Sequence, residues 1–148
     1  MADSFAQILI HLTFHTRVDS PTILEEHLPR VFDYIGGEIR ALNGISFAIG
    51  GRPDHIHCLT TLPKTMSLSD FVMNVKKGVS KWIKTIDDRY RLFSWQDGYG
   101  AFSVSYAIKD RVINYIANQE LHHKKKTFKE EYLEFLRSNN IEYDERYV

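Results

Sequence analysis

A turn running into a strand is predicted for Gly51-Arg52-Pro53-Asp54-His55-Ile56-His57-Cys58-Leu59-Thr60-Thr61-Leu62. Side chains on a strand point alternately to opposite faces, so His55 and His57 share one face while Ile56 and Cys58 point the other way, into a core. Paired imidazoles on one face can offer two nitrogen ligands to one metal ion. The same pattern also fits a pair of exposed strand histidines without a metal. A zinc site that includes Cys58 is not expected, because its thiol faces the core.

Three more strands are predicted from the same alternation. Phe5 to Thr16 is the longest, with one face formed by Ile8, Ile10, Leu12 and Phe14 and the other by Gln7, His11, Thr13 and His15. A short second strand is indicated by Ile45, Phe47 and Ile49, and a fourth by Phe102, Val104 and Tyr106. The second strand ends at the pair Gly50-Gly51, a bend where a backbone can come close to a ligand such as DNA.

Four helical segments are predicted, over about residues 22–42, 68–86, 110–126 and 128–137. In the first segment, Pro29 and the pair Gly36-Gly37 are expected to weaken the helix or break it in two. The second segment has the clearest start, because Ser67 and Asp70 match the box in which side-chain oxygens cap free backbone amides.

The order strand, helix, strand, strand, helix, strand is the split β-α-β, ferredoxin-like arrangement of the α+β class. We expect helices on one face of an antiparallel sheet, with the other face open for function. Since Ile56 faces the core, both neighbouring histidines are assigned to the open face. An additional C-terminal helix carries Tyr115, and residues 1–148 are expected to form a single domain.

The composition is that of an ordinary globular chain without a strong electrostatic field. Charged residues make up 26% and hydrophobic residues 43%, and 19 basic residues balance 19 acidic ones. A polyanion would therefore have to bind at a local basic patch. The one cysteine excludes an internal disulfide, and neither a membrane-spanning run nor a signal peptide is recognised, so we expect a cytoplasmic protein.

The third helix brings residues that could act as a nucleophile or as metal ligands onto one face. Tyr115 and Gln119 are four residues apart and are therefore neighbours on a helix, and His122 continues their face. A glutamine oxygen is an acceptable ligand for Mg²⁺ or Mn²⁺. A tyrosine one turn away can act as a nucleophile, although a packing role for the ring fits the same spacing.

Several stretches, in this order along the chain, resemble the single-tyrosine HUH transposases of small bacterial insertion sequences and their repeat-associated domesticated relatives. The stretches are His11-Leu12-Thr13-Phe14-His15-Thr16-Arg17, His55-Ile56-His57, Lys77-Gly78-Val79-Ser80, Gly98-Tyr99, Phe102-Ser103-Val104-Ser105, and Tyr115-Ile116-Ala117-Asn118-Gln119 with His122-His123. The resemblance extends from about Ile8 to Phe135 and implies one HUH transposase domain.

The resemblance implies a DNA transposase that cleaves and joins single-stranded DNA. Tyr115 would attack a phosphodiester and form a 5′-phosphotyrosine, while His55, His57 and Gln119 would hold Mg²⁺ or Mn²⁺, with His122 as a possible accessory residue. The family recognises DNA hairpins near the element ends. It forms homodimers in which the tyrosine helix of one subunit can complete the metal site of the other.

Local basic residues are candidates for contacts with DNA phosphates. They are Arg17, Arg52, Lys76, Lys77, Lys81, Lys84 and the run Lys124-Lys125-Lys126. Three other functions stay open at this point. One is a non-catalytic nucleic-acid-binding module that uses an open sheet face. The second is a domesticated relative that processes chromosomal repeat palindromes. The third is a small metal-dependent hydrolase that uses water and forms no tyrosine adduct.

Overall fold

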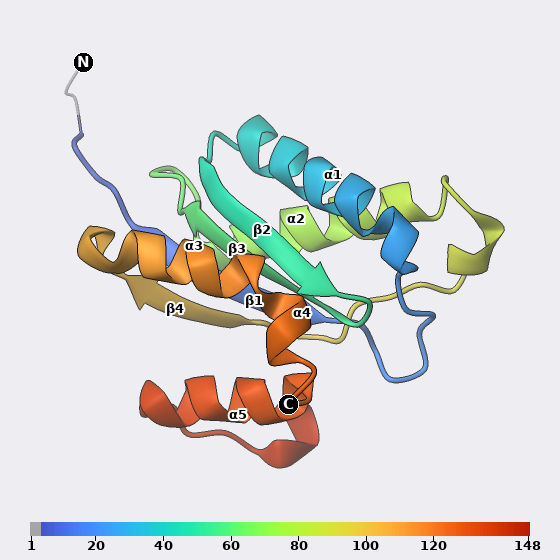
Figure 1. Ribbon diagram of the computed structural model, residues 1–148. Helices are drawn as coiled ribbons and strands as arrows, with labels where there is room; N and C mark the ends of the chain where they lie inside the picture. The colour runs from blue at the N-terminus through green and yellow to red at the C-terminus, as the bar shows by residue number, and fades with distance from the viewer. Residues whose placement is uncertain (1–3) are drawn as a thin grey trace.

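A computed structural model describes residues 4–148, without the side chain of His122, and has a four-stranded antiparallel sheet with helices on both faces (Figure 1). The strands are β1 (Leu9–His15), β2 (Ser46–Arg52), β3 (His55–Thr61) and β4 (Gly100–Val104). Their spatial order is β2-β3-β1-β4, which is the order of the split β-α-β arrangement. The predicted α+β class and ferredoxin-like fold are confirmed.

The first helical layer consists of α1 (Leu28–Ala41) and α2 (Leu68–Ile83), which pack on the apolar face of the sheet. As predicted, the oxygen of Ser67 accepts a hydrogen bond from the backbone of Asp70 and caps α2. The predicted interruption of α1 is wrong. Pro29 lies in the first turn, where its missing N–H is not needed, and the Gly36-Gly37 pair stays within a continuous helix.

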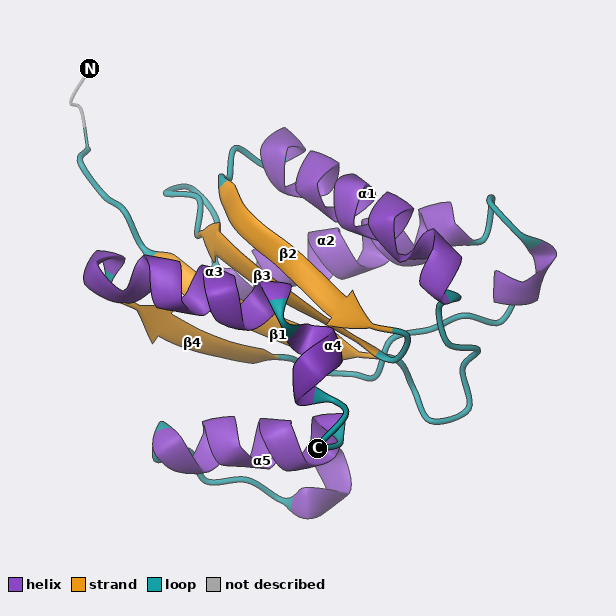
Figure 2. Cartoon of the chain, in the orientation of Figure 1, coloured by secondary structure: helices purple, strands orange, loops and turns teal. Residues whose placement is uncertain are grey.

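The second layer consists of α3 (Lys109–Ala117), α4 (Gln119–His122) and α5 (Phe128–Ser138), all C-terminal to the sheet (Figure 2). This layer covers the face that was predicted to be open, so that prediction is wrong. The predicted helix from Asp110 to Lys126 is also not continuous, because it breaks at Asn118 between α3 and α4. The last helix agrees with the prediction to within one residue. Short 3₁₀ turns cover Glu25–His27, Asp88–Tyr90, Tyr106–Ile108 and Glu145–Tyr147.

Gly50 on β2 lets α3 approach the sheet closely. A Cβ atom at this position would lie 2.6 Å from the backbone oxygen of Ile116, so any larger residue would push the helix away. The close backbone approach expected at the Gly50-Gly51 bend is therefore made by α3. This contact holds the segment that carries Tyr115 over β2 and β3.

The sheet face under α3 and α5 is buried but polar. His11, Thr13, His55 and His57 are all less than 5% exposed. The register of β1 and β3 pairs Thr13 with His57 and His15 with His55. Every buried side-chain nitrogen or oxygen of the described residues has a hydrogen-bond partner. None of the described helices combines the length and apolar character needed to cross a membrane.

Candidate active site

His55 and His57 project from the same face of β3, as predicted, and each is held at Nδ1 by a neighbour. The Asp54 carboxylate lies 2.8 Å from Nδ1 of His55, and Nε2 of His11 lies 2.8 Å from Nδ1 of His57. Such outer contacts orient an imidazole so that its other nitrogen can bind a metal. The opposite nitrogens, both Nε2, face Gln119 and Glu131.

Gln119 lies next to His55, which places the predicted third ligand at the histidine pair. Its Oε1 is 3.1 Å from Nε2 of His55, while its Nε2 donates to the backbone oxygen of Tyr115 at 3.3 Å. A neutral His55 that donates from Nδ1 to Asp54 has a lone pair at Nε2. Two acceptors then face each other, and a cation between them would remove the repulsion.

Tyr115 lies over the same cluster, within one chain. Its ring centroid is 5.9 Å from that of His57 and 6.0 Å from that of His11. The phenol donates a hydrogen bond to Oε2 of Glu131. Burial, followed by the hydrogen bond and charge of Glu131, raises the pKa of Tyr115 well above its ordinary value. The phenol is therefore protonated at neutral pH in this arrangement.

Glu131 on α5 joins the cluster and was missed by the sequence analysis. Its Oε1 lies 2.8 Å from Nε2 of His57, and its side chain is only 5% exposed. Burial opposes ionisation, but the hydrogen bonds and charges of its neighbours outweigh it and lower the pKa of Glu131 to about 2. A signal was present in the sequence. Glu131 interrupts the apolar stripe of α5, whose neighbouring residues Phe128, Tyr132 and Leu136 pack inward.

Three histidines of this cluster, His11, His57 and His123, are neutral at pH 7. Burial lowers the pKa of His57 to about 4, and burial with the nearby His57 lowers the pKa of His11 to about 3. Burial also lowers the pKa of His123, whose Nε2 lies 3.1 Å from Oε1 of Gln119. Neutral imidazoles keep the lone pair that metal binding requires. Cys58 lies on the opposite face in the apolar core, as predicted, so a zinc site that includes it is excluded.

The donor atoms fit one divalent ion. One ligand atom each of His55, His57 and Glu131 lies within 4.8 Å of the others, and the amide oxygen of Gln119 lies at the same histidine pair. Two imidazoles with carboxylate and amide oxygens form a mixed nitrogen and oxygen set that suits Mn²⁺ and related ions. His122 belongs to α4, but its side chain is outside the described part of the chain, so its accessory role stays a prediction.

The basic residues expected to bind DNA lie in different places. Lys77 and Lys81 lie on α2 and Lys84 follows its last residue, in the helical layer on the other side of the sheet from the histidines. Lys76 donates to the backbone oxygens of Gln96 and Gly98 and so ties down a loop. Arg17 pairs with Asp19 at 3.3 Å. Their roles in DNA binding stay predictions.

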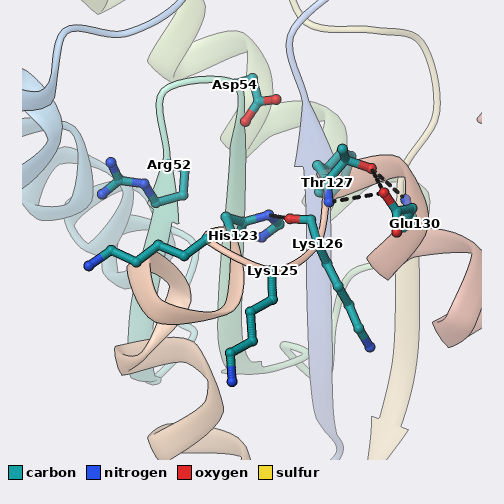
Figure 3. Close-up of a pocket in the computed structure, with 9 residues that line it drawn as sticks. Arg52, Asp54, His123, Lys125, Lys126, Thr127 and Glu130 are labelled. Carbon is teal, nitrogen blue, oxygen red and sulfur yellow. Dashed lines mark hydrogen bonds between the residues drawn. The ribbon is translucent and has the colours of Figure 1, made fainter.

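Arg52 lies beside the site, in a pocket of about 420 Å³ (Figure 3). The pocket is lined by Arg52, Asp54, His123, Lys124, Lys125, Lys126, Thr127, Phe128 and Glu130. Arg52 also pairs with Glu25. Phe128 stacks on His55, with ring centroids 4.4 Å apart and planes at 20°. The pocket therefore adjoins the imidazole pair and has a basic rim formed by the loop between α4 and α5.

Comparisons with known proteins identify the family and similar folds. Residues 4–119 match the protein family described as "Transposase IS200 like". A protein of Deinococcus radiodurans R1 assigned as a transposase has 18% identity and a TM-score of 0.62, with 80% of this chain and 95% of that chain covered. A REP-associated tyrosine transposase bound to a REP hairpin has 17% identity and a TM-score of 0.59, with 83% and 74% covered. No curated protein matches the chain.

Proposed function

The chain belongs to the IS200-like transposase family, and from this premise we propose that it cleaves and rejoins single-stranded DNA with Tyr115 as the nucleophile. The observation that carries the proposal is the shared contact at Glu131. The phenol of Tyr115 and Nε2 of His57 both reach this carboxylate, so the nucleophile and the candidate metal ligands form one cluster.

The cluster is complete within one chain, which bears on the expected homodimer. Gln119, two residues after the α3 terminus, contacts His55 of its own chain. A tyrosine helix from a second subunit is therefore not needed to complete the cluster, and we propose that Tyr115 serves the metal site of its own chain. In this proposal the expected homodimer serves another step, such as holding two DNA ends together.

In the proposed step, the Tyr115 oxygen bonds to phosphorus and the bond from phosphorus to the 3′ oxygen breaks. The phenol loses a proton and the departing 3′ oxygen gains one, so no net proton is consumed. The product is a 5′-phosphotyrosine and a free 3′ hydroxyl. Because one phosphodiester is exchanged for another, rejoining by the reverse step needs no nucleotide triphosphate. A hydrolase that uses water would form no such adduct.

His55, His57 and Gln119 would hold the divalent ion, Mg²⁺ or Mn²⁺, that the family implies. When bound, such an ion supplies positive charge that neutralises the scissile phosphate and orients it. The chain supplies the rest of the site. Asp54 and His11 orient the two imidazoles through contacts at Nδ1. The helices α3 and α5 exclude water from the cluster, where both histidines are fully buried.

The basic pocket beside the site is the proposed path of the DNA strand. Arg52 and the loop lysines 124–126 can contact phosphates, and the pocket reaches Phe128, which stacks directly on His55. The family and the hairpin-bound neighbour support a substrate with a hairpin, and a mobile element and a domesticated repeat-processing role are both compatible with it. A non-catalytic module that binds RNA on an open sheet face is disfavoured, because helices cover that face.

A covalent-adduct experiment tests this function. Single-stranded DNA fragments that tile the region flanking the gene, labelled at the 3′ end, are incubated with the full chain and Mn²⁺ and run on a denaturing gel. We expect wild type to form a labelled protein adduct and Tyr115→Phe to form none. Tyr106→Phe, at a tyrosine that is 61% exposed, is the matched control and should behave as wild type. An adduct of equal yield with Tyr115→Phe would overturn the assignment.

A further inference from the structure

Glu131 lies outside the part of the chain that matches the family. The match ends at residue 119, whereas Glu131 belongs to α5, which begins at Phe128. Family membership therefore assigns no role to this carboxylate. Its position in the cluster has to be explained from its own contacts.

The contacts of Glu131 are divided between its two oxygens. Oε1 lies 2.8 Å from Nε2 of His57, the nitrogen that faces the candidate metal position. Oε2 accepts the hydrogen bond of the Tyr115 phenol and lies 3.4 Å from Nε2 of His123. One side chain thus joins a metal-ligand candidate to the nucleophile.

The spacing suits a shared ion. One ligand atom each of His55, His57 and Glu131 lies within 4.8 Å of the others. Bonds of roughly 2.0–2.2 Å to a divalent ion put neighbouring ligand atoms about 3–4 Å apart. Small side-chain adjustments are therefore enough to bring these three atoms to one ion.

The start of α5 is built to hold Glu131 in this position. Thr127 and Glu130 form a reciprocal capping box that sets the first turn of the helix. Phe128 stacks on His55, and Tyr132 packs with Phe102 of β4. Glu131 is 4% exposed between these anchors. A buried carboxylate is costly to desolvate, and a cation beside it offsets that cost.

From this geometry we propose that Glu131 is a ligand of the divalent ion through Oε1, while its Oε2 positions the phenol of Tyr115. The proposal rests on the metal role of His55 and His57 given above and adds a ligand from α5. The C-terminal helix is then part of the metal centre. The competing explanation is that Glu131 occupies the metal position and blocks it.

Mn²⁺ affinity, measured by isothermal titration calorimetry on the full chain, separates these explanations. We expect Glu131→Ala to weaken Mn²⁺ binding by roughly tenfold to a hundredfold or more. Glu131→Asp keeps a carboxylate and should retain more of the affinity than Glu131→Ala. The matched control is Glu134→Gln, on the same helix, where the exposed carboxylate pairs with Lys126. It should bind Mn²⁺ within twofold of wild type, a margin of about 0.4 kcal/mol.

The outcomes also distinguish this proposal from the proposed function. Wild-type affinity in Glu131→Ala, together with loss of binding in His57→Ala, would overturn the role of Glu131 and keep the histidine site. Tighter Mn²⁺ binding or faster DNA cleavage in Glu131→Ala would identify Glu131 as a block and also overturn the proposal. Wild type that binds no Mn²⁺ would contradict both. If Glu131→Ala does not fold by circular dichroism, the near-isosteric Glu131→Gln takes its place, with the same weakening expected.

Discussion

Ile56 and His57 are neighbours on β3 and both are completely buried, but they lie on opposite faces of the sheet with opposite chemistry. Ile56 and Cys58 pack into the apolar core beneath α1 and α2. His57 instead contacts His11 and Glu131 through hydrogen bonds beneath α3 and α5. Burial alone therefore does not distinguish the two faces.

The difference is informative because burying polar groups brings little stability. An imidazole or a carboxylate removed from water has to recover its lost hydration through hydrogen bonds, whereas an aliphatic side chain gains from burial directly. The apolar face is sufficient to hold the fold, and the polar face has a residue set that a purely structural layer would not need. We therefore assign stability mainly to the first face and chemistry to the second.

The largest expected effect is that of His57→Ala on cleavage. We expect the adduct-forming rate to fall by roughly 10²- to 10⁴-fold, because a metal ion contributes several kcal/mol of charge stabilisation at the transition state. The rate is measured by the gel assay under single-turnover conditions, and circular dichroism checks the fold. Undiminished cleavage by the folded variant would remove the metal role from this face.

Ile56→Ala, one residue away, should have the opposite effects: it should lower the stability of the fold and leave the cleavage rate nearly unchanged. Truncation of a fully buried isoleucine costs about 2–5 kcal/mol of unfolding free energy. Urea unfolding measures that loss, and the cleavage rate per folded molecule should stay within twofold of wild type. A selective loss of cleavage with unchanged stability would break the division between the two faces.

Acidification should destabilise the polar face. His11 and His57 have their pKa lowered to about 3 and about 4 in the fold, against 6.5 when unfolded, so between these values the unfolded chain binds more protons. Stability therefore rises with pH in this window and is lost as pH falls from 6.5 towards 4, at no more than about 1.4 kcal/mol per pH unit for each imidazole.

Below pH 4.5 the fold loses further stability as pH falls, because the pKa of Glu131 is lowered to about 2. Cys58 on the apolar face contributes nothing here, since burial raises its pKa to about 12. Urea unfolding at pH 7, 6 and 5 measures the slope. His11→Asn removes one titrating group and should reduce the slope, while His15 and His123, whose pKa burial also lowers, keep their share of it. A flat profile for wild type would show that these imidazoles titrate as they do in the unfolded chain.

The smallest expected effect concerns DNA affinity. Lys125 lines the pocket beside His55, whereas Lys81 lies on α2 in the layer across the sheet. Lys125→Ala should lower the slope of log affinity against log salt by about 0.7 for single-stranded DNA, the value for one phosphate contact. Lys81→Ala should leave the slope unchanged in the same fluorescence-anisotropy titration. The reverse result would place the DNA on the other face.

Several features of the site could be predicted from local patterns. The alternation of β3 placed His55 and His57 together, and the spacing of Tyr115 and Gln119 predicted that they are neighbours on one face. The amide of Gln119 does reach the backbone oxygen of Tyr115, although the helix breaks at Asn118 between them. The burial of the histidine face was not foreseen, because it depends on how α3 and α5 pack over the sheet. The break at Asn118 was not foreseen either.

Strand alternation, helix periodicity and capping are interactions between residues close in the chain, so the sequence by itself determined the α+β fold and the two faces of β3. The partnership of Glu131 with His57 joins residues 74 positions apart. Only the packing of α5 over the sheet decided this partnership. The apolar residues of α5, Phe128, Tyr132 and Leu136, do not indicate which surface they will cover. Local patterns identify which residues share a face, and long-range packing determines which other residues that face contacts.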